Sequence, residues 1–259
     1  MEVHHHPDLH HKPKPWKEYF LEFIMIFLAV TLGFFAESFR EYRSDRAKEK
    51  EYVEGFIKDL SKDVEELNTV ISQNYDLAQG IYGLESDFSL YLNRGKRDSN
   101  LIKKTVDSFN RVGVLDRIYD GCTKYLTTSY RFKTHDATMV QLRNSGGFRL
   151  IQKDHAADSI ATYDLVNLNT EYEEKIYVDE FAVIYDLWAH TFDLSYVAGK
   201  KDPITESALI SGNNDMRYFY NKVAQLRGTV AQYVNKFLMP QLEYAKRMIE
   251  YLKKEYKVS

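Results

Sequence analysis

The sequence predicts an all-α protein in which a single N-terminal transmembrane helix runs into a long amphipathic helix, followed by an antiparallel helical bundle domain. Three observations predict this class. One apolar run near the N-terminus is long enough to span a membrane, and apolar residues recur every three or four positions through most of the later chain. Proline and glycine are scarce, with 5 and 12 among 259 residues, and few short runs alternate apolar with polar residues as half-buried strands do.

Four segments are expected along the chain. They are a His-rich tail at 1–15, a transmembrane helix at 16–37, a long amphipathic helix or stalk at 38–95 and a helical bundle domain at 96–259. A chain of this length can bury one large core or two small ones. Its one cysteine, Cys122, excludes an intramolecular disulfide framework.

The transmembrane segment is predicted from length and composition. The eighteen residues 19–36 contain one charged residue, Glu22. As a helix rising about 1.5 Å per residue, residues 16–37 span roughly 30 Å, which is the thickness of a bilayer core. Trp16 suits the aromatic belt at a membrane interface. A cleaved signal peptide is the alternative, but the run is longer than a typical signal core and no small-x-small cleavage site follows it.

The membrane orientation depends on the basic residues that flank this helix. Counting only Lys and Arg favours the large domain on the cytoplasmic side, because five of them occur in the fourteen residues after the helix. The short N-terminal tail is itself basic and His-rich, however, and is therefore awkward to translocate, whereas long domains cross largely regardless of charge. We expect the N-terminus to be cytoplasmic and the helical domain to lie on the opposite side.

One face of the membrane helix combines small and acidic residues. Glu22, Ala29, Gly33 and Glu37 follow one another at intervals of 7, 4 and 4 residues, which places them on a common face. Ala29 and Gly33 form a small-xxx-small pair, and a mid-membrane carboxylate costs roughly 2.5–3.5 kcal/mol. We predict that this face packs on another transmembrane helix, from a second copy or a partner protein. Alternatively Glu22, less than two turns from Trp16, reaches the headgroups and water.

The N-terminal tail contains five clustered histidines: His4, His5, His6, His10 and His11. Clustered imidazoles can bind Zn²⁺ or another divalent metal without a preformed fold, so the tail is a candidate metal site. Two other interpretations stay open. The cluster is an affinity tag, although Val, Pro, Asp and Leu interrupt it, or it is a pH-responsive tail that gains charge as the pH falls through about 6.5.

The stalk shows the spacing of an amphipathic helix. Its predicted apolar stripe comprises Val53, Phe56, Leu60, Val64, Leu67, Ile71, Tyr75, Ala78 and Tyr82. Such a stripe needs a partner, either the later helices of the same chain or a coiled-coil mate. A loop at 93–100 is expected to end the helix.

The C-terminal domain is expected to consist of helices and short loops. The predicted elements are helical residues 101–132, a short helix that begins at 137, a glycine turn at 144–147, a helix at 170–196 and a last helix at 215–257. Gly113 or Gly121 is expected to interrupt the first of these. Pro240 is expected to kink the last, because proline has no N–H to donate and crowds the preceding turn.

The sequence favours no enzyme class. It contains no glycine-rich phosphate loop, nucleophile elbow or dinucleotide-binding fingerprint. Asp186 and His190 lie four residues apart, and His135 precedes Asp136, but such short pairs are more often surface or capping groups than metal ligands. Cys122 is expected to be a packed thiol. A net charge of −3 without a basic stripe argues against nucleic acid as a partner.

Several segments resemble one known family. The His-rich tail, Trp16-Lys-Glu-Tyr, residues 22–37, Lys50-Glu-Tyr and, more loosely, residues 142–151 with Tyr163 are similar to a family of single-pass membrane proteins of Bacteroidota, known as a domain of unknown function (the DUF6090 type). The resemblance implies that Glu22, Gly33 and Glu37 belong to a shared N-terminal module. It also implies a bacterial cell-envelope setting, and it supplies no activity to carry over. We expect the helix to lie in the bacterial inner membrane.

Three functions fit these observations. The favoured one is a membrane-anchored helical scaffold or accessory subunit of a cell-envelope complex, whose partners are membrane lipid and either further copies of itself or another membrane protein. The second is an oligomeric pore or ion-driven unit with a ring of Glu22 side chains. The third is a metal- or pH-responsive sensor that uses the histidine tail.

Overall fold

The computed structural model describes residues 15–93, 111–153, 155–198, 203–210 and 212–258. All regular structure in these ranges is helical, apart from one antiparallel bridge between Phe192 and Leu209. The predicted all-α class is therefore confirmed for the described part of the chain. By its contacts the chain divides into two compact units, residues 1–51 and 52–259.

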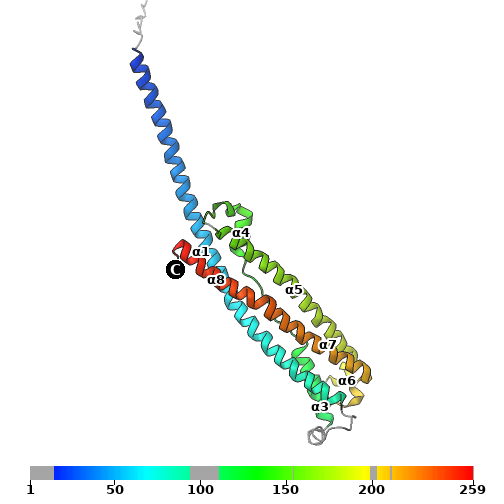
Figure 1. The fold of residues 1–259 in the computed structure, drawn as a ribbon. Helices are drawn as coiled ribbons and strands as arrows, with labels where there is room; N and C mark the ends of the chain where they lie inside the picture. The colour runs from blue at the N-terminus through cyan, green and yellow to red at the C-terminus, as the bar shows by residue number, and fades with distance from the viewer. Residues whose placement is uncertain (1–14, 94–110, 154, 199–202, 211, 259) are drawn as a thin grey trace, which may run out of the picture. The chain divides into compact units, whose positions relative to one another are not determined.

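Figure 1 shows the helices of the described residues. In order they are α1 (Trp16–Leu92), α3 (Arg111–Tyr125), α4 (Ala137–Ser145), η1 (Gly147–Leu150), α5 (Ala156–Thr191), α6 (Leu194–Val197), η2 (Glu206–Ala208), α7 (Asn213–Gln232), η3 (Tyr233–Leu238) and α8 (Met239–Tyr256). The elements η1 and η2 are 3₁₀ helices, and η3 is a π-helix.

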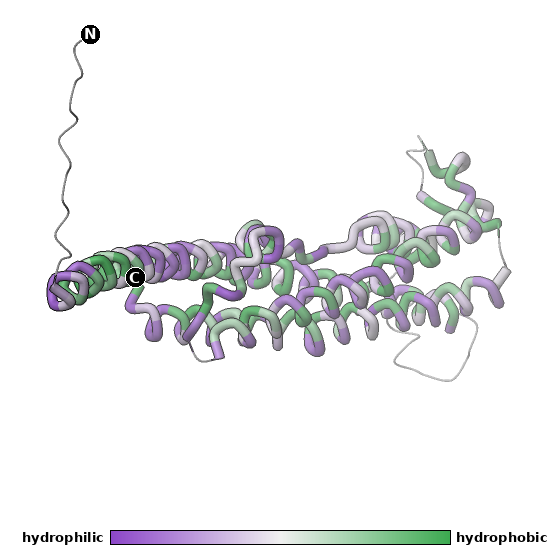
Figure 2. Tube along the Cα trace, turned by 90° about the horizontal axis from the view of Figure 1, so that it is seen from above, coloured by the Kyte–Doolittle hydropathy of each residue, from purple (hydrophilic) through white to green (hydrophobic). Residues whose placement is uncertain are grey.

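The first unit contains the apolar start of α1. No proline interrupts the 77 residues of this helix. Its most apolar stretch has the length and composition of a membrane span, and none of that stretch is buried. Figure 2 shows a mostly green, hydrophobic stretch that follows the first turn of α1. A helix that is apolar all round is normally covered, by protein or by lipid, and no part of the described chain covers this one.

In the second unit, the buried face of α1 repeats at alternating intervals of three and four residues. Its members are Val53, Phe56, Leu60, Asp63, Leu67, Val70, Asn74, Leu77, Ile81, Leu84, Phe88 and Tyr91. The predicted stripe was right at its beginning but wrong further on, because Tyr75 and Tyr82 are exposed. The polar residues Asp63 and Asn74 occupy positions of the buried face. A prediction that uses apolar residues alone replaces them with their neighbours Val64 and Tyr75, and the predicted face then departs from the buried one.

α1 and α5 run in the same direction. Asp63 accepts a hydrogen bond from Tyr163, and Asn74 accepts one from Tyr177, so residue numbers rise together along the two helices. The stalk part of α1 is therefore parallel to α5 of the predicted bundle domain.

α7, η3 and α8 follow one another in the direction opposite to α5. Tyr233 stacks on Tyr177, whereas Tyr244, further along, stacks on the earlier Tyr163. The distortion expected at Pro240 takes the form of the π-helix immediately before it. The wider π-helical turn accommodates a residue that donates no backbone hydrogen bond and whose ring crowds the carbonyl four residues earlier.

An extended segment, residues 126–136, returns the chain along α1 and is called the strap below. The sequence predicted helix as far as residue 132, with a break near Gly113 or Gly121. Instead α3 passes through both glycines and ends at Tyr125. Gly80 of α1 permits this close packing of α3, since a Cβ at Gly80 would overlap the Tyr125 ring. Because the strap is the returning element, α5 can lie parallel to α1.

Two apolar cores lie along the second unit. The first joins the beginning of this part of α1 to α4, the start of α5 and the end of α8, and it includes Phe56, Leu142, Ile160 and Met248. The second joins the rest of α1 to α3, the later half of α5, and α7, and it includes Phe88, Ile118, Ile184 and Phe219. Buried polar side chains lie between the two cores, on α1, α5 and α8.

Candidate functional site

The strap is held against α1 by polar side chains of the buried face. Asp63 accepts a hydrogen bond from the backbone N–H of His135, with an O···N distance of 2.7 Å. Eleven residues further along α1, the Asn74 side-chain amide donates to the carbonyl oxygen of Tyr130 at 3.0 Å. The spacing of these two contacts fixes the register of the strap along the helix.

A third contact from α1 caps the helix that follows the strap. Asp136 precedes α4, but its side chain makes no capping hydrogen bond. Asp59 supplies the cap from α1, because its carboxylate accepts the Thr138 backbone N–H at 2.8 Å. A carboxylate satisfies unpaired N–H groups at a helix start and interacts favourably with the helix dipole.

Asp63 is the most elaborately hydrogen-bonded side chain of this site. Its carboxylate accepts the backbone N–H of His135, the Thr134 hydroxyl at 3.2 Å and the Tyr163 hydroxyl at 2.8 Å, and it lies 3.0 Å from Nδ1 of His135. Burial raises the pKa of Asp63 above its ordinary value, and the hydrogen bonds oppose that shift only in part. A buried carboxyl with this set of donors organises the surrounding chain segments.

The hydrogen bonds continue from Asp63 into a polar layer between the two cores. This polar layer comprises Asp63, Tyr163, Asn167, Thr170 and Gln241, all of them buried. The Gln241 amide donates to Asn167 at 2.5 Å, and the Thr170 hydroxyl donates to Gln241 at 2.6 Å. The layer thus connects α1, α5 and α8, and it selects one alignment of the three because a slipped helix would leave buried polar atoms unpaired.

A second hydrogen-bonded group lies further along the strap. The Tyr177 hydroxyl donates to Asn74 at 2.8 Å and accepts the Tyr130 backbone N–H at 3.2 Å. The rings of Tyr177 and Tyr233 stack with centroids 4.7 Å apart, and the Tyr233 hydroxyl accepts the Phe132 backbone N–H at 3.4 Å. Burial raises the pKa of both hydroxyls, which therefore remain protonated hydrogen-bonding groups.

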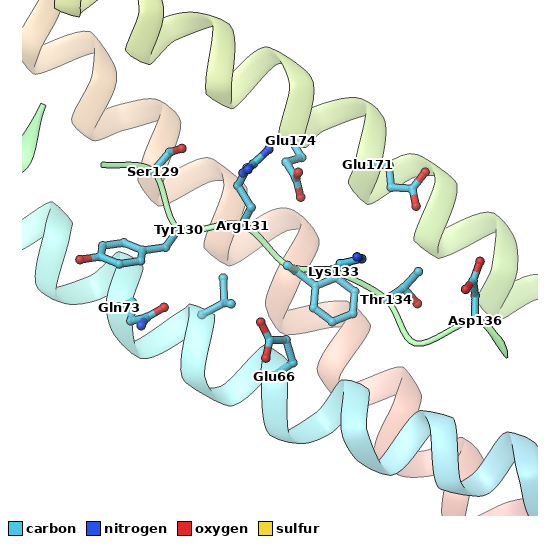
Figure 3. Close-up of a pocket in the computed structure, with 12 residues that line it drawn as sticks. Glu66, Gln73, Ser129, Tyr130, Arg131, Lys133, Thr134, Asp136, Glu171 and Glu174 are labelled. Atoms are coloured by element: carbon cyan, nitrogen blue, oxygen red, sulfur yellow. The ribbon is translucent and has the colours of Figure 1, made fainter. Parts of the chain in front are cut away.

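Beside the strap lies a groove of about 600 Å³. Its charged lining residues are Glu66, Arg131, Lys133, Asp136, Glu171 and Glu174. Figure 3 shows the strap passing between α1 and α5, with Arg131 directed toward Glu174. Burial raises the pKa of Glu174, while the positive charge of Arg131 opposes the shift. Acids outnumber bases four to two, which favours polar or cationic groups over phosphate.

None of the polar-layer residues was among the predicted site residues. The sequence does contain a signal for two of the buried polar residues, because Asp63 and Asn74 are polar residues that occupy positions of the alternating three-and-four spacing of α1. A single polar residue in such a seam commonly specifies register. Their partners lie from 56 to 103 residues away in the chain, so sequence spacing gave no indication of them.

The predicted transmembrane face lies in the first unit. Ala29, Gly33 and Glu37 are exposed, and Glu22 is half-exposed. A Cβ at Gly33 would meet nothing within 4 Å, so no contact in the described chain requires glycine there. Glu37 accepts hydrogen bonds from Arg40, one turn further along, at 2.9 Å from Nε, so its charge is compensated within its own helix.

The other residues considered in the sequence have ordinary surroundings or lie outside the described residues. His4, His5, His6, His10 and His11 lie outside them, and the metal-binding prediction for the tail stays a prediction. Nδ1 of His190 donates to the backbone carbonyl of Asp186 at 2.8 Å, and the His190 side chain is exposed. Cys122 is buried in the second core, where burial raises the pKa of its thiol.

Comparison with known proteins gives no further assignment. No family model matches the chain, and neither curated proteins nor solved structures match it. The resemblance of the N-terminal module to the Bacteroidota family therefore stays a prediction from its residues.

Proposed function

We propose that this chain is a membrane-anchored helical scaffold or accessory subunit of a bacterial cell-envelope complex. The observation that supports this proposal best is the apolar start of α1, which has the length of a membrane span and is not buried by any described residue. In this proposal the helix lies in the inner membrane with the N-terminus in the cytoplasm. Residues 52–259 act as a helical bundle that presents contact surfaces on the periplasmic side.

Packing of the membrane helix is the first part of the proposed mechanism. Gly33 has open space around its Cβ position, which leaves room for the close approach of a second helix. Ala29 lies one turn away on the same face, and Glu22 lies closer to the interface. A neighbouring helix, from a second copy or another membrane protein, would cover this face and give the Glu22 carboxylate a protein environment.

Rigidity of the second unit is the second part of the proposed mechanism. The strap, the polar layer and the two tyrosines of the second group join α1, α5 and α8 through buried hydrogen bonds. Such a network selects one arrangement of helices. A scaffold needs a fixed surface geometry, and this network supplies it.

The test is the particle mass of the full-length protein in nanodiscs, with and without Glu22→Gln. We expect a defined assembly for the unchanged protein and altered assembly for the variant, because the carboxylate lies on the packing face. Glu18→Gln is the matched control, since Glu18 is exposed in the first turn of α1, before the apolar run of residues 19–36. A monomer with and without the substitution, and without co-purifying membrane partners, would contradict the packing proposal.

A further inference from the structure

The outer face of α5 is apolar, and none of the described residues covers it. Leu165, Leu168, Tyr172, Ile176 and Val183 are all exposed, with 60% of the Leu165 surface and 67% of the Tyr172 surface accessible. These five residues, called the α5 stripe, lie on one helical face because 3.6 residues complete each turn. The stripe extends from residue 165 to residue 183, or about 27 Å at 1.5 Å per residue. Figure 1 shows α5 along one edge of its unit.

The opposite face of α5 is already used by the core. Ile160, Tyr163, Tyr177, Ile184 and Trp188 are buried against the other helices of the unit. A helix at the surface of a domain normally has one apolar face and one polar face. α5 is therefore apolar on two sides, and packing of residues 52–259 accounts for only one of them.

Acidic residues border the α5 stripe. α5 contains eight Asp and Glu residues and a single Lys, Lys175. Asp158, Asp179 and Asp186 lie on the helical face of the stripe, and Glu171 lies one turn from Leu168; all four are exposed. Two copies of this face would repel each other, and so would this face and an anionic membrane surface. The charge around the stripe instead complements a positively charged occupant.

We propose that the α5 stripe docks an amphipathic helix of a partner protein, with apolar residues on one side and Lys or Arg along its edges. The apolar side of that helix covers the stripe, and its basic edges pair with the bordering acids. This inference rests on the proposed scaffold function, because it assigns a class of partner to the bundle surface. A docked helix of about eighteen residues matches the length of the stripe.

The test measures peptide binding to the full-length protein in nanodiscs of zwitterionic lipid. The probe is a fluorescent Leu/Lys peptide of about eighteen residues with one apolar face, matched in length to the stripe. A scrambled peptide of the same composition and a Leu/Glu peptide of the same pattern serve as peptide controls, and empty nanodiscs report binding to lipid. Fluorescence anisotropy at low and high salt gives each affinity.

Three variants locate the binding surface. Tyr172→Gln with Ile176→Gln should weaken binding of the Leu/Lys peptide at least tenfold, and Glu171→Gln with Asp179→Asn should reduce its salt dependence. Tyr218→Gln is the matched control, because Tyr218 is an equally surface-placed tyrosine of α7, with 53% of its surface exposed, and lies away from the stripe. All five positions are exposed, so these substitutions leave both cores intact.

The outcomes separate this inference from the proposed function. Loss of peptide binding in the stripe variants alone supports it. Equal binding of the scrambled or Leu/Glu peptide, or undiminished binding to Tyr172→Gln with Ile176→Gln, overturns it. So does a dimer that those two substitutions dissociate, since the stripe would then be a self-interface. The particle mass of Glu22→Gln tests packing of the membrane helix, whereas peptide binding tests the α5 stripe. A negative result in one experiment therefore does not decide the other.

Discussion

Asp63 shows how two opposing electrostatic effects act on one buried carboxyl. Burial disfavours the charged form, whereas hydrogen bonds from Thr134, His135 and Tyr163 favour it. Burial is the larger effect, so the pKa is raised in the folded protein. Folding therefore strengthens proton binding at this residue, and its ionised form is less favourable in the folded chain than in the unfolded one.

This shift predicts how Asp63→Asn changes the dependence of stability on pH. A carboxyl whose pKa is raised in the folded protein contributes most to stability at low pH, below its ordinary pKa of about 3.9. This contribution is lost as the pH rises from that value through the higher pKa of the folded state. The asparagine variant lacks this decrease. We expect the free energy of unfolding of the wild type, minus that of the variant, to fall with rising pH, as measured by denaturant unfolding in mild detergent across the acidic range.

His135 requires a control in this experiment because its Nδ1 lies 3.0 Å from the Asp63 carboxylate, so the loss of this contact also contributes to the difference. The same pair of measurements in a His135→Gln background removes that contribution. If the difference between the wild type and Asp63→Asn instead grew with pH, the hydrogen bonds would outweigh burial and the direction of the pKa shift would be wrong.

At the scale of elements, the position of the strap depends on hydrogen bonds from Asn74 that the local geometry of Asn74 within α1 does not indicate. Asn74 and Asn68 both donate to the carbonyl four residues earlier in α1, at 2.9 and 2.7 Å. Only Asn74 is buried and also bonds to Tyr130 and Tyr177. The two asparagines thus form a matched pair: both make the same bond within α1, and only Asn74 also bonds to residues outside α1.

Asn74→Ala should lower the free energy of unfolding by about 2 kcal/mol, because buried polar groups of Tyr130 and Tyr177 lose their partner. Asn68→Ala should change it by no more than about 0.5 kcal/mol, since Asn68 is exposed and alanine favours helix. Denaturant unfolding of both variants measures the difference. Equal effects would mean that the strap contributes nothing to stability through Asn74.

Helices were predictable here and the strap was not, for a physical reason. Long runs without proline and with apolar residues every three or four positions specify helices locally, as in α1 and α7. The strap is extended because it bonds to α1 and α5, which are distant in sequence. A local signal did exist: Tyr130, Phe132 and Thr134 are more buried than the intervening Arg131 and Lys133, an alternation typical of extended chain.

The polar layer shows the same limit for the candidate site. Thr170 and Gln241 lie 71 residues apart and meet only when α5 and α8 are packed. The type of each residue is ordinary for a helix surface, so composition gives no reason to place either of them in the interior. Sequence predicted the transmembrane face instead, because a charged residue within an apolar run stands out without knowledge of any partner.

At the scale of the whole molecule, the apolar run of α1 and the packed cores belong to different units. Both apolar cores and the polar layer consist of residues from 53 onward. The unburied apolar run belongs to the unit of residues 1–51. Because neither core uses a residue of the first unit, the second unit has what it needs to fold by itself.

A chain of residues 52–259 should therefore appear in the soluble fraction and keep its helical content and cooperative unfolding. Removing only residues 1–14 is the matched control, and that chain should stay in the membrane fraction because it retains the apolar run of α1. Fractionation, circular dichroism and thermal unfolding measure these properties. If residues 52–259 were found in the membrane fraction, the second unit would itself bind lipid and the prediction would be wrong. Loss of helical content would show instead that the division between the units does not reflect independent folding.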